Sequence, residues 1–534
     1  MSQVRAVAQP AAVEMRGVAK AFGACVANRD VTIRVERGTV HAVVGENGAG
    51  KSTCMKMLYG LYRPDCGEIL IHGKARAWRS PRDAIAAGLG MVHQHFMLAG
   101  PYTGLDNIIL GDEPSQGFWR WLPAAWRPID RSQARRRLQE LMAAYHLQVD
   151  LDVPVETLPV GVQQRLEILK LLYRGVDILI LDEPTAVLTP QEVDEFFTNL
   201  CRLKDQGKTI IVITHKLGEV LRYADDVTVL RRGATVAERP VAGMTAPELA
   251  ELMVGRVVHL QVAPPPSPKL GAEQLRLAKV TMGQRGEKPK LADLSLVVRS
   301  GEIVGIAGIE GNGQSDLLRL LLDPGRYLHR ASLGQRITAK GEINVLGRDV
   351  SSFRAKALRA LGLGVVPEDR CQQGLLLSQS LWTNFLLGVQ RMPRFGRFGF
   401  IRRRQVTSAL AAAIKAFDVR PADQQQIASG LSGGNQQKLI IAREFIGDPR
   451  LFICAQPTRG VDVGSIEFIH QRILDARAGG TAVLLISSAL EEVMALADRI
   501  LVFYDGKIVQ EFRRGEADEA KIGHFMGGGS RGDD

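Results

Sequence analysis

The feature that most limits the fold of this chain is an internal repeat, because one long stretch occurs twice. Gly45–Ser52 matches Gly308–Ser315 at an offset of 263 residues, and Asp182–Thr185 matches Ala455–Thr458 at an offset of 273. The change in offset places an insertion in the second copy, around Asp323–Lys340. Such self-similarity indicates two copies of one structural unit, so we expect duplicated domains rather than a single large core.

A proline-rich run separates the two copies. Residues 263–268 read Ala-Pro-Pro-Pro-Ser-Pro, which favours extended polyproline II and makes a short, stiff spacer. Glycine-rich and charged terminal residues are usually poorly ordered. The sequence therefore predicts a flexible N-terminus over residues 1–10, a first domain over 11–262, a linker over 263–270, a second domain over 271–526 and a flexible tail over 527–534.

Composition argues against a chain that crosses a membrane by itself. Its 534 residues contain no apolar stretch near the ~20 residues that span a bilayer, and residues 1–9 lack the apolar region of a signal peptide. A net charge of +11 suits nucleic acid, anionic lipid or nucleotides without choosing among them. The cysteines form no Cys-x-x-Cys pair, so we expect reduced thiols; only Cys54, after a glycine-rich loop, is expected to have its pKa lowered by a helix dipole.

Each half has the pattern of an α/β domain. The predicted strands Val40–Val44, Asp177–Leu181 and Thr209–Thr214 alternate with helical stretches such as Arg131–Tyr145. A polar cluster follows the C-terminal end of each strand, which is where parallel α/β sheets bind ligands.

The first half contains a phosphate-binding pattern, G-x-x-x-x-G-K-S, directly after a predicted strand. Glycines let backbone N–H groups wrap phosphates, and the following helix offers its positive end. Lys51 would reach the β- and γ-phosphates and Ser52 would ligate Mg²⁺; the alternative is a glycine-rich turn. The predicted ATP-binding residues here are Gly45, Glu46, Asn47, Gly48, Ala49, Gly50, Lys51, Ser52 and Thr53.

Two carboxylates emerge together after the apolar strand Asp177–Leu181. Asp182 would hold the Mg²⁺ shell, and Glu183 would act on the attacking water as general base. His215, after the next strand, fits a γ-phosphate contact, and Gln94 fits both Mg²⁺ and the water. Phe22 is a candidate to stack on adenine, although a core phenylalanine is an equally simple interpretation.

Together with these motifs, the segment Leu431–Lys438, which reads L-S-G-G-N-Q-Q-K, resembles the ABC ATPase family over nearly the whole chain. The resemblance implies an α/β fold of two tandem P-loop NTPase domains. Each would have a RecA-like α/β core, an antiparallel β part and a helical subdomain. It also implies ATP hydrolysis, with ATP and Mg²⁺ as cofactors.

The tandem arrangement resembles the double-cassette ATPases of bacterial sugar-type importers, marked here by Val366–Arg370, Pro457–Asp462 and Glu251–Arg256. Gly308–Ser315 and Ala455–Gly460 are most similar to the nucleoside-uptake branch, since monosaccharide members generally keep Asp-Glu-Pro at the second position. Ribose/galactose-type import is the alternative.

The same resemblance implies partners and a location. These are two transmembrane permease subunits, a solute-binding lipoprotein that acts indirectly, and the cytoplasmic face of the inner membrane as a peripheral protein; no nucleic acid is expected. Permeases of the family dock after Gln94, here around Tyr102–Leu110. Trp119, Trp121 and Trp126 either contribute to that contact or pack in a core.

In the family, two cassettes pair head to tail, and each ATP lies between the P-loop of one and the L-S-G-G helix of the other. The resemblance implies that both sites form within this chain. Site one would combine Lys51, Ser52, Gln94, Asp182, Glu183 and His215 with Ser432, Gly433, Gly434 and Gln436. Site two is degenerate and comprises Gly308, Gly311, Gly313, Gln314, Ser315, Ala455, Gln456 and Ser488, facing Leu158–Gly161 in place of L-S-G-G.

Two rival functions stay open. Double-cassette proteins that act on ribosomes have a long charged linker and two intact sites, and those that act on DNA carry zinc-binding cysteine pairs; this chain has none of these features. A non-catalytic nucleotide sensor would not need Glu183 and His215. The sequence therefore predicts one hydrolytic site per chain.

Overall fold

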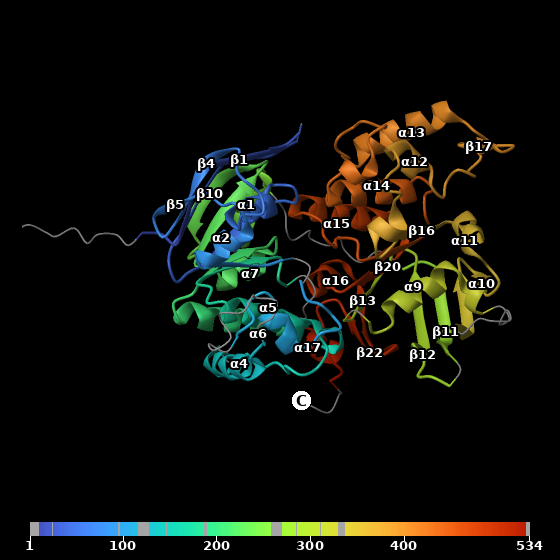
Figure 1. Ribbon diagram of the computed structural model, residues 1–534. Coiled ribbons are helices and arrows are strands. Elements are labelled where there is room, and N and C mark those ends of the chain that lie inside the picture. Colours follow the sequence, from blue (N-terminus) through green and yellow to red (C-terminus); the bar gives the residue numbers. More distant parts are fainter. Residues whose placement is uncertain are drawn as a thin grey trace, which may run out of the picture. The chain divides into compact units, whose positions relative to one another are not determined.

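The computed structural model divides into two compact units, Met1–Val258 and His259–Asp534 (Figure 1). Gln94, the three tryptophans at 119, 121 and 126, and most of the predicted linker and flexible ends lie outside the described residues. The described residues are 10–23, 25–93, 97–115, 128–145, 147–185, 190–257, 270–284, 286–309, 311–328 and 337–529.

The first unit is built on a parallel sheet. Its strands are rich in Val, Ile and Leu and largely buried, as expected for strands covered on both faces. Asp182 is paired with Ile213, and Ile213 with Val43, so the ends of three strands lie at one level. In spatial order the strands are β6 (Leu89–Val92), β7 (Ile178–Asp182), β8 (Thr209–Ile213), β3 (Val40–Val44) and β9 (Asp226–Arg231), followed by the antiparallel β10 (Ala234–Pro240).

A second, antiparallel layer extends the same sheet beyond β10 through a single pairing of Ala234 with Asp30. Its strands are β2 (Cys25–Val35), β1 (Val13–Phe22), β4 (Cys66–Ile71) and β5 (Lys74–Arg76). The helices associated with the sheets are α1 (Lys51–Leu58), α2 (Pro81–Ala86), α6 (Pro190–Asp205), α7 (Leu217–Tyr223) and α8 (Ala246–Val254).

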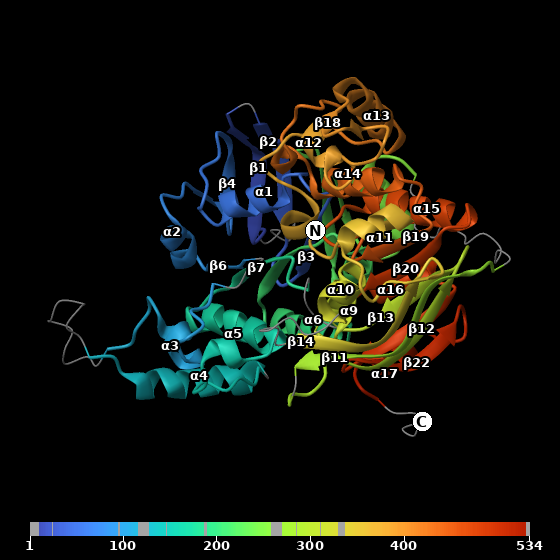
Figure 2. The same ribbon diagram turned by 90° about the vertical axis from the view of Figure 1, so that its right-hand side faces the viewer.

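Three helices of the first unit form a subdomain with its own apolar core (Figure 2). They are α3 (Gly104–Ile109), α4 (Arg131–Tyr145) and α5 (Val160–Tyr173). Ile108, Leu138 and Leu166 are fully buried between them. The predicted helix Arg131–Tyr145 is confirmed to the residue, and its apolar positions explain why it packs there.

The second unit repeats the parallel sheet with the same strand order. Ala455 is paired with Ile486 and Ala307 with Ser487, which again brings three strand ends to one level. The strands are β16 (Leu363–Val366), β19 (Leu451–Ala455), β20 (Ala482–Ser487), β13 (Ile303–Ala307), β21 (Arg499–Tyr504) and the antiparallel β22 (Lys507–Arg513). The expectation of a duplicated α/β domain is therefore confirmed.

The antiparallel part of this unit is a separate sheet of β12 (Leu291–Arg299), β11 (Glu273–Gln284), β14 (Ile337–Val345) and β15 (Arg348–Asp349). An extra helix, α10 (Pro324–Tyr327), lies where the offset predicts an insertion. The remaining α-helices and strands are α9 (Gln314–Leu322), α11 (Ala355–Leu361), α12 (Leu381–Leu386), β17 (Gly396–Arg397), β18 (Phe400–Ile401), α13 (Arg403–Ala416), α14 (Gly433–Phe445), α15 (Val463–Ala478), α16 (Leu490–Leu496) and α17 (Glu519–Met526).

Among the residues that the structure describes, no helix has the length and apolar character needed to span a bilayer.

Candidate active site

The glycine-rich loop of the first unit joins β3 to α1. Gly50 caps α1 with φ of 94°, and a Cβ there would lie 2.6 Å from the Ala27 carbonyl oxygen, so only glycine fits. The Lys51 Nζ donates to the carbonyl oxygens of Gly45 at 2.7 Å and Glu46 at 3.0 Å. The ammonium is thus held against the loop itself, where a bound phosphate would meet it.

Ser52 and Asp182 come together at the end of β7. The Ser52 Oγ donates to Asp182 Oδ1 at 3.3 Å, and Asp182 is buried. Burial raises the pKa of Asp182, and the Ser52 hydrogen bond opposes that rise. A hydroxyl and a carboxylate oxygen side by side are the hard ligands that Mg²⁺ prefers, so these two residues fit the predicted metal role.

Glu183 occupies a strained backbone position next to His215. Its φ is 47°, and its N–H donates to the Ile213 carbonyl at 2.9 Å, which fixes the turn. Its Oε1 lies 3.1 Å from His215 Nδ1, and this hydrogen bond lowers the pKa of Glu183 against the opposing effect of burial. The two neighbouring carboxyls, Asp182 and Glu183, therefore have pKa values shifted in opposite directions, a pattern typical of divided catalytic roles.

A buried network that the sequence analysis missed supports this turn. The Glu219 carboxylate accepts from the hydroxyls of Thr185 at 2.5 Å and Thr214 at 3.1 Å. The Lys216 Nζ donates to the Thr185 carbonyl at 2.9 Å. Glu219 thus fixes the segments that carry Glu183 and His215, and its place in the first turn after His215 is the only signal that the sequence offered.

Phe22 lies at the end of β1 and is 44% exposed, so its interpretation as a core phenylalanine is wrong. Its ring meets Tyr62 edge to face, with 5.1 Å between centroids, and the Lys20 ammonium lies 5.7 Å from its centre. An exposed ring that is supported from one side can stack on a base, which keeps the prediction for adenine open. Tyr62 was not singled out from the sequence.

Gln94 lies outside the described residues, but Met97, the next described residue, is anchored on α5. The Met97 N–H donates to Glu167 Oε1 at 2.8 Å, and the Lys170 Nζ donates to the Met97 carbonyl at 3.1 Å. Glu167 is buried, which raises its pKa. The chain at Met97 is therefore tied to the helix that begins at Val160.

The expectation for Cys54 is wrong. Its side chain is fully buried in the core under α1, and burial raises its pKa to about 12, which outweighs the dipole of the helix. We expect Cys54 to stay unmodified when the folded chain meets a maleimide, while the exposed Cys66 and Cys371 react. Peptide mass spectrometry measures each site, and rapid labelling of Cys54 before unfolding would contradict the burial.

The second unit keeps the backbone of this site with different side chains. Gly313 caps α9 with φ of 109°, and the Gln314 Nε2 donates to the Ile309 carbonyl at 3.0 Å, as Lys51 does to Glu46. Gln456 has φ of 48° and donates its N–H to the Ile486 carbonyl at 2.7 Å, as Glu183 does to Ile213. The same local fold therefore carries an amide where the first unit has a carboxylate.

The other side chains around the second loop are also neutral where the first unit has ionisable ones. The Gln456 Oε1 accepts from the Ser488 N–H at 3.2 Å and hydroxyl at 3.1 Å, where the first unit has the Glu183–His215 pair. The buried Ala455 ends β19, and its side chain has no polar atom to offer Ser315. Gly308 and Gly311 complete the loop, and Gly311 has φ of 96°. An amide has no basicity for proton abstraction, so this set lacks a general base.

The L-S-G-G segment begins α14. The Ser432 Oγ accepts from the Asn435 side chain at 2.9 Å and from its N–H at 3.4 Å, which leaves the Ser432 hydroxyl hydrogen as a donor. Gly434 is required, because a Cβ would lie 2.3 Å from Ser465 Oγ. Gly433 is partly exposed in the first turn. In the first unit the corresponding helix α5 is capped by Pro159, which makes no side-chain hydrogen bond.

Gln436 and Arg370 support the start of α14. Gln436 is buried; its Nε2 donates to the Ala428 carbonyl at 3.0 Å, and its Oε1 accepts from Arg370 Nε at 3.2 Å. Arg370 also donates to the carbonyls of Arg459 at 2.5 Å and Gly460 at 3.3 Å. The Gln436 amide is thus engaged inside the second unit, and its contact with ATP stays a prediction. The sequence analysis quoted Arg370 only as the end of the family segment Val366–Arg370 and predicted no role for it.

The fold and these side chains define the class of protein to which the chain belongs. A glycine-rich loop between a buried parallel strand and a helix, with a hydroxyl–carboxylate pair beside it, is typical of a P-loop NTPase domain, and the chain contains this fold twice. The family model described as "ABC transporter" matches residues 28–186 and 291–459. The chain belongs to the ABC transporter family and is one of its ATPases.

Curated relatives match over nearly their full length. The glucose import ATP-binding protein TsgD13 of Haloferax volcanii is 44% identical to this chain, and the match covers 97% of this chain and 96% of TsgD13. The nucleoside import ATP-binding protein NupA of Lactococcus lactis subsp. cremoris is 42% identical, and the match covers 98% of this chain and 99% of NupA. The guanosine import ATP-binding protein NupO of Bacillus subtilis is 42% identical, and the match covers 97% of this chain and 98% of NupO. The tandem arrangement is thus shared with import ATP-binding proteins.

Proposed function

We propose that the chain hydrolyses ATP at one site, formed on the P-loop of its first unit, to energise solute import through separate membrane permeases. The observation that carries this proposal is the Glu183–His215 pair beside Ser52 and Asp182, which the second unit replaces with Gln456, Ser488 and Ala455. A chain that only sensed nucleotide would not need this pair. ATP is the proposed nucleotide, since the relatives TsgD13, NupA and NupO are named as ATP-binding proteins.

Each side chain of the candidate active site in the first unit has a distinct role in this proposal. Lys51 neutralises charge on the terminal phosphates, and Glu183 accepts a proton from the attacking water. His215 orients Glu183 through its Nδ1 and would contact the γ-phosphate. Ser52 and Asp182 would hold Mg²⁺, together with Gln94, and the bound cation would stabilise negative charge on the phosphates.

Ser432, Gly433 and Gly434 are proposed to contact the γ-phosphate of the same ATP. The donor left on the Ser432 hydroxyl and the start of α14 both favour an anion. The complementary pattern of intact and lost residues supports this pairing: the intact catalytic set is in one half and the intact signature is in the other. Both nucleotide sites would then form within one chain.

The Glu183–His215 hydrogen bond makes the pH dependence of turnover testable. Because this bond lowers the Glu183 pKa, it keeps the carboxylate ionised as the pH falls. Replacing His215 with Ala leaves the burial that raises the pKa, so the acid limb of the profile of kcat/KM against pH should move to higher pH. His215→Gln, which can still donate a hydrogen bond, should move it less. An unchanged acid limb in both variants would contradict the role of His215.

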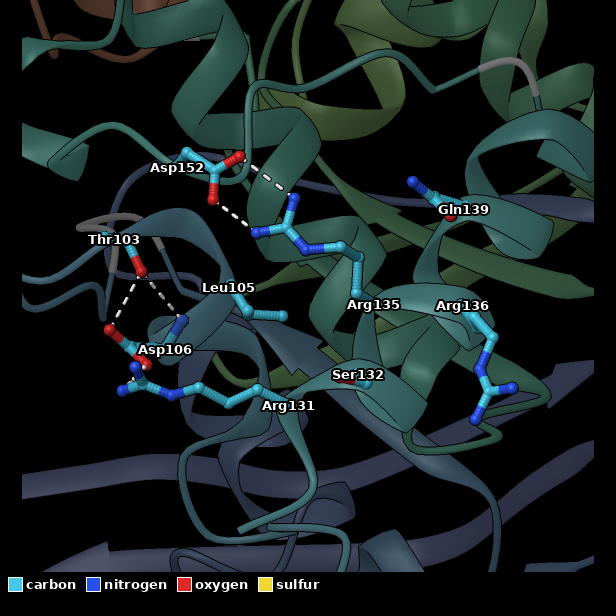
Figure 3. A pocket seen from close by; sticks show the side chains of 9 residues that line it. All are labelled: Thr103, Leu105, Asp106, Arg131, Ser132, Arg135, Arg136, Gln139 and Asp152. Atoms are coloured by element: carbon cyan, nitrogen blue, oxygen red, sulfur yellow. Dashed lines mark hydrogen bonds and ion pairs between the residues drawn. The ribbon is translucent and has the colours of Figure 1, made fainter.

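Permease docking is proposed on the helical subdomain of the first unit. A shallow hollow of about 620 Å³ lies between α3 and α4, lined by Thr103, Asp106, Arg131, Arg135 and Arg136 among others (Figure 3). Asp106 pairs with Arg131 at 2.8 Å, and Asp152 with Arg135. Nearby, Tyr102 is 61% and Leu110 58% exposed.

This hollow is suited to a short amphipathic segment of a permease. Its lining is mostly charged and polar with the apolar Leu105, and the exposed Tyr102 and Leu110 belong to the same predicted docking region without lining the hollow. Met97 is anchored by Glu167 and Lys170 on α5, which packs against α3 and α4. Two permease subunits, with an extracytoplasmic lipoprotein beyond them, would place the chain peripherally on the cytoplasmic face of the membrane.

Nucleosides are the proposed solute. The relatives NupA and NupO are named for nucleoside and guanosine import, and Gln456 stands where monosaccharide members generally keep an acid. A sugar is the second candidate, because the relative at 44% identity is named for glucose import.

The test is reconstitution with the permeases and the binding protein of the same system. We expect the chain to co-purify with two permease subunits. Nucleosides, and not ribose or glucose, should then stimulate ATP turnover in the presence of the binding protein. Stimulation by a sugar alone would transfer the assignment to the second candidate, and failure to co-purify with any permease would contradict the import function.

A further inference from the structure

A short hairpin of the second unit exposes large apolar side chains. It connects α12 to α13 and consists of β17 and β18, which are paired antiparallel with Arg397 opposite Phe400. Phe398 at its tip is 85% exposed, Phe400 is 80% exposed and Ile401 is 45% exposed. In Figure 1 the hairpin projects from the end of the unit that carries α12 and α13. A contiguous group of exposed apolar side chains indicates an interaction surface.

The base of the hairpin is firmly attached to the core of the unit. The Phe395 ring is buried and meets Phe385 edge to face, with 6.3 Å between centroids. The Arg402 N–H donates to the Phe395 carbonyl at 2.8 Å. A Cβ on Gly396 would lie 2.3 Å from the Gln390 carbonyl oxygen, so β17 begins at a glycine that permits this close packing. The base is therefore fixed, while the three apolar side chains beyond it stay uncovered.

The turn at the tip contains a residue that is unfavourable there. Phe398 and Gly399 form the two-residue loop, with φ angles of 51° and 85°. Positive φ at both positions matches a type I′ turn, for which Asn-Gly is the preferred pair. A bulky aromatic residue in this conformation costs local free energy. Phe398 is thus unfavourable both for the turn and for its exposure to water, which indicates that a partner outside the folded chain compensates.

Six arginines flank these apolar side chains, and no acidic residue occurs between Asp369 and Asp418 in the sequence. They are Arg391, Arg394, Arg397, Arg402, Arg403 and Arg404. None of the six forms an ion pair within the part of the chain that the structure describes. The last three lie at the N-cap and first turn of α13, where the helix dipole favours anions and disfavours cations. The hairpin therefore presents uncompensated positive charge, which suits an anionic partner.

The placement of the apolar side chains favours a membrane surface over a nucleic acid. Successive residues of a strand point to opposite faces, so Phe400 and Ile401 lie on opposite faces of the hairpin, with Phe398 at the turn. Ile401 has no ring to stack on a base, and the Arg397 guanidinium already lies 5.0 Å from the centre of the Phe398 ring. A second copy of the hairpin would bring like charges together. An apolar tip above a cationic base matches the acyl boundary and headgroups of an anionic bilayer.

We propose that residues 391–404, the basic hairpin, bind a membrane surface that contains anionic lipids. Phe398, Phe400 and Ile401 enter the boundary of the acyl chains, and the arginines contact the lipid phosphates. This surface belongs to the second unit, whereas the hollow proposed for the permease belongs to the first. The inference goes beyond the import function, since binding to lipid requires neither a permease nor ATP.

The test uses the full chain and vesicles, with no permease or nucleotide. Cosedimentation measures binding to vesicles of phosphatidylcholine alone and to vesicles of equal parts phosphatidylcholine and phosphatidylglycerol. We expect binding to the mixed vesicles that added salt weakens, and little binding to phosphatidylcholine alone. Arg402→Gln, Arg403→Gln and Arg404→Gln together should weaken binding to the mixed vesicles by about 10- to 100-fold.

A second variant combines Phe398→Asn with Phe400→Thr and separates lipid binding from folding. It should weaken binding to the mixed vesicles by about 10- to 100-fold, because most of the exposed apolar area of the tip is lost. It also places the preferred Asn-Gly pair in the turn, so the melting temperature should be unchanged or higher. Weaker binding by a chain of equal or greater stability cannot result from misfolding.

Val509→Ser is the matched control. Val509 is 39% exposed on β22, which Figures 1 and 2 show at the opposite end of the second unit from the hairpin. This variant should bind the mixed vesicles as the unaltered chain does. Equal binding by the hairpin variants and the unaltered chain would overturn the proposal. So would single-stranded RNA binding that the hairpin variants lose while their vesicle binding stays.

Co-purification in detergent distinguishes lipid from permease as the partner. The hairpin variants should co-purify with the permeases as well as the unaltered chain does, and a selective loss in these variants would assign the hairpin to the permease and overturn the proposal. Failure of the unaltered chain to co-purify bears on the import function alone, because the vesicle assay contains no permease.

Discussion

Glu183→Gln abolishes ATP turnover while the chain still binds ATP; this is the first of the two largest effects that we expect. A general base contributes about 10²- to 10⁴-fold to a rate, and glutamine has the same shape without the basicity. The left-handed φ of 47° should be tolerated, since the second unit holds Gln456 at 48°. Single-turnover ATPase assays and equilibrium nucleotide binding measure the two properties separately.

The matched control for this variant is Gln456→Glu in the second unit. It places a carboxylate on the same backbone turn. The positions equivalent to Lys51, Asp182 and His215, however, hold Gln314, Ala455 and Ser488. We expect turnover to change less than twofold. Substantial residual hydrolysis in Glu183→Gln, or its loss in a chain altered only at Gln456, would show that the catalytic carboxylate had been assigned to the wrong unit.

Lys51→Ala is the second change with a large expected effect. It removes the ammonium that lies against the loop, and with it a charge-assisted contact of about 1.5–3 kcal/mol to phosphate. Nucleotide affinity at the first site should fall about 10- to 100-fold and turnover should be lost, because the same charge stabilises the transition state. Titration with a fluorescent ATP analogue and steady-state turnover provide the measurements.

Gln314→Ala is the equivalent change in the second unit, and it should leave turnover nearly intact. Only a neutral hydrogen bond to the Ile309 carbonyl is lost, with a net contribution of about 0.5–1.5 kcal/mol. The two variants remove side chains from equivalent loops, so any general weakening of the fold should appear in both. Equal losses of turnover would contradict a single hydrolytic site per chain.

Local patterns in the sequence were sufficient to predict the glycine-rich loop, the parallel strands and the repeat. The strand Val40–Val44 and the helix Arg131–Tyr145 have their predicted bounds, because continuous apolar residues and helical periodicity are local signals. The meeting of Ser52 with Asp182 followed from one further rule, that neighbouring parallel strands end at the same edge of a sheet.

Other features depended on packing that no local pattern contains. Cys54 follows a loop at a helix N-terminus, but the core around it decides its pKa. Glu368 looked like part of a family segment, and only the order of β16 and β19 reveals that it reaches Ser315. Phe22 could not be assigned to core or surface until its place at the end of β1 was known.

The hydrogen bonds of Arg370 have a mechanical consequence. One guanidinium fastens the segment after β16, the turn before α15 and the first turn of α14, so none of them can shift alone without losing contacts of about 0.5–1.5 kcal/mol each. This corner of the second unit should therefore move as one stiff body, and a displacement at one segment reaches the others undiminished. The second unit thus keeps a rigid corner at the start of α14.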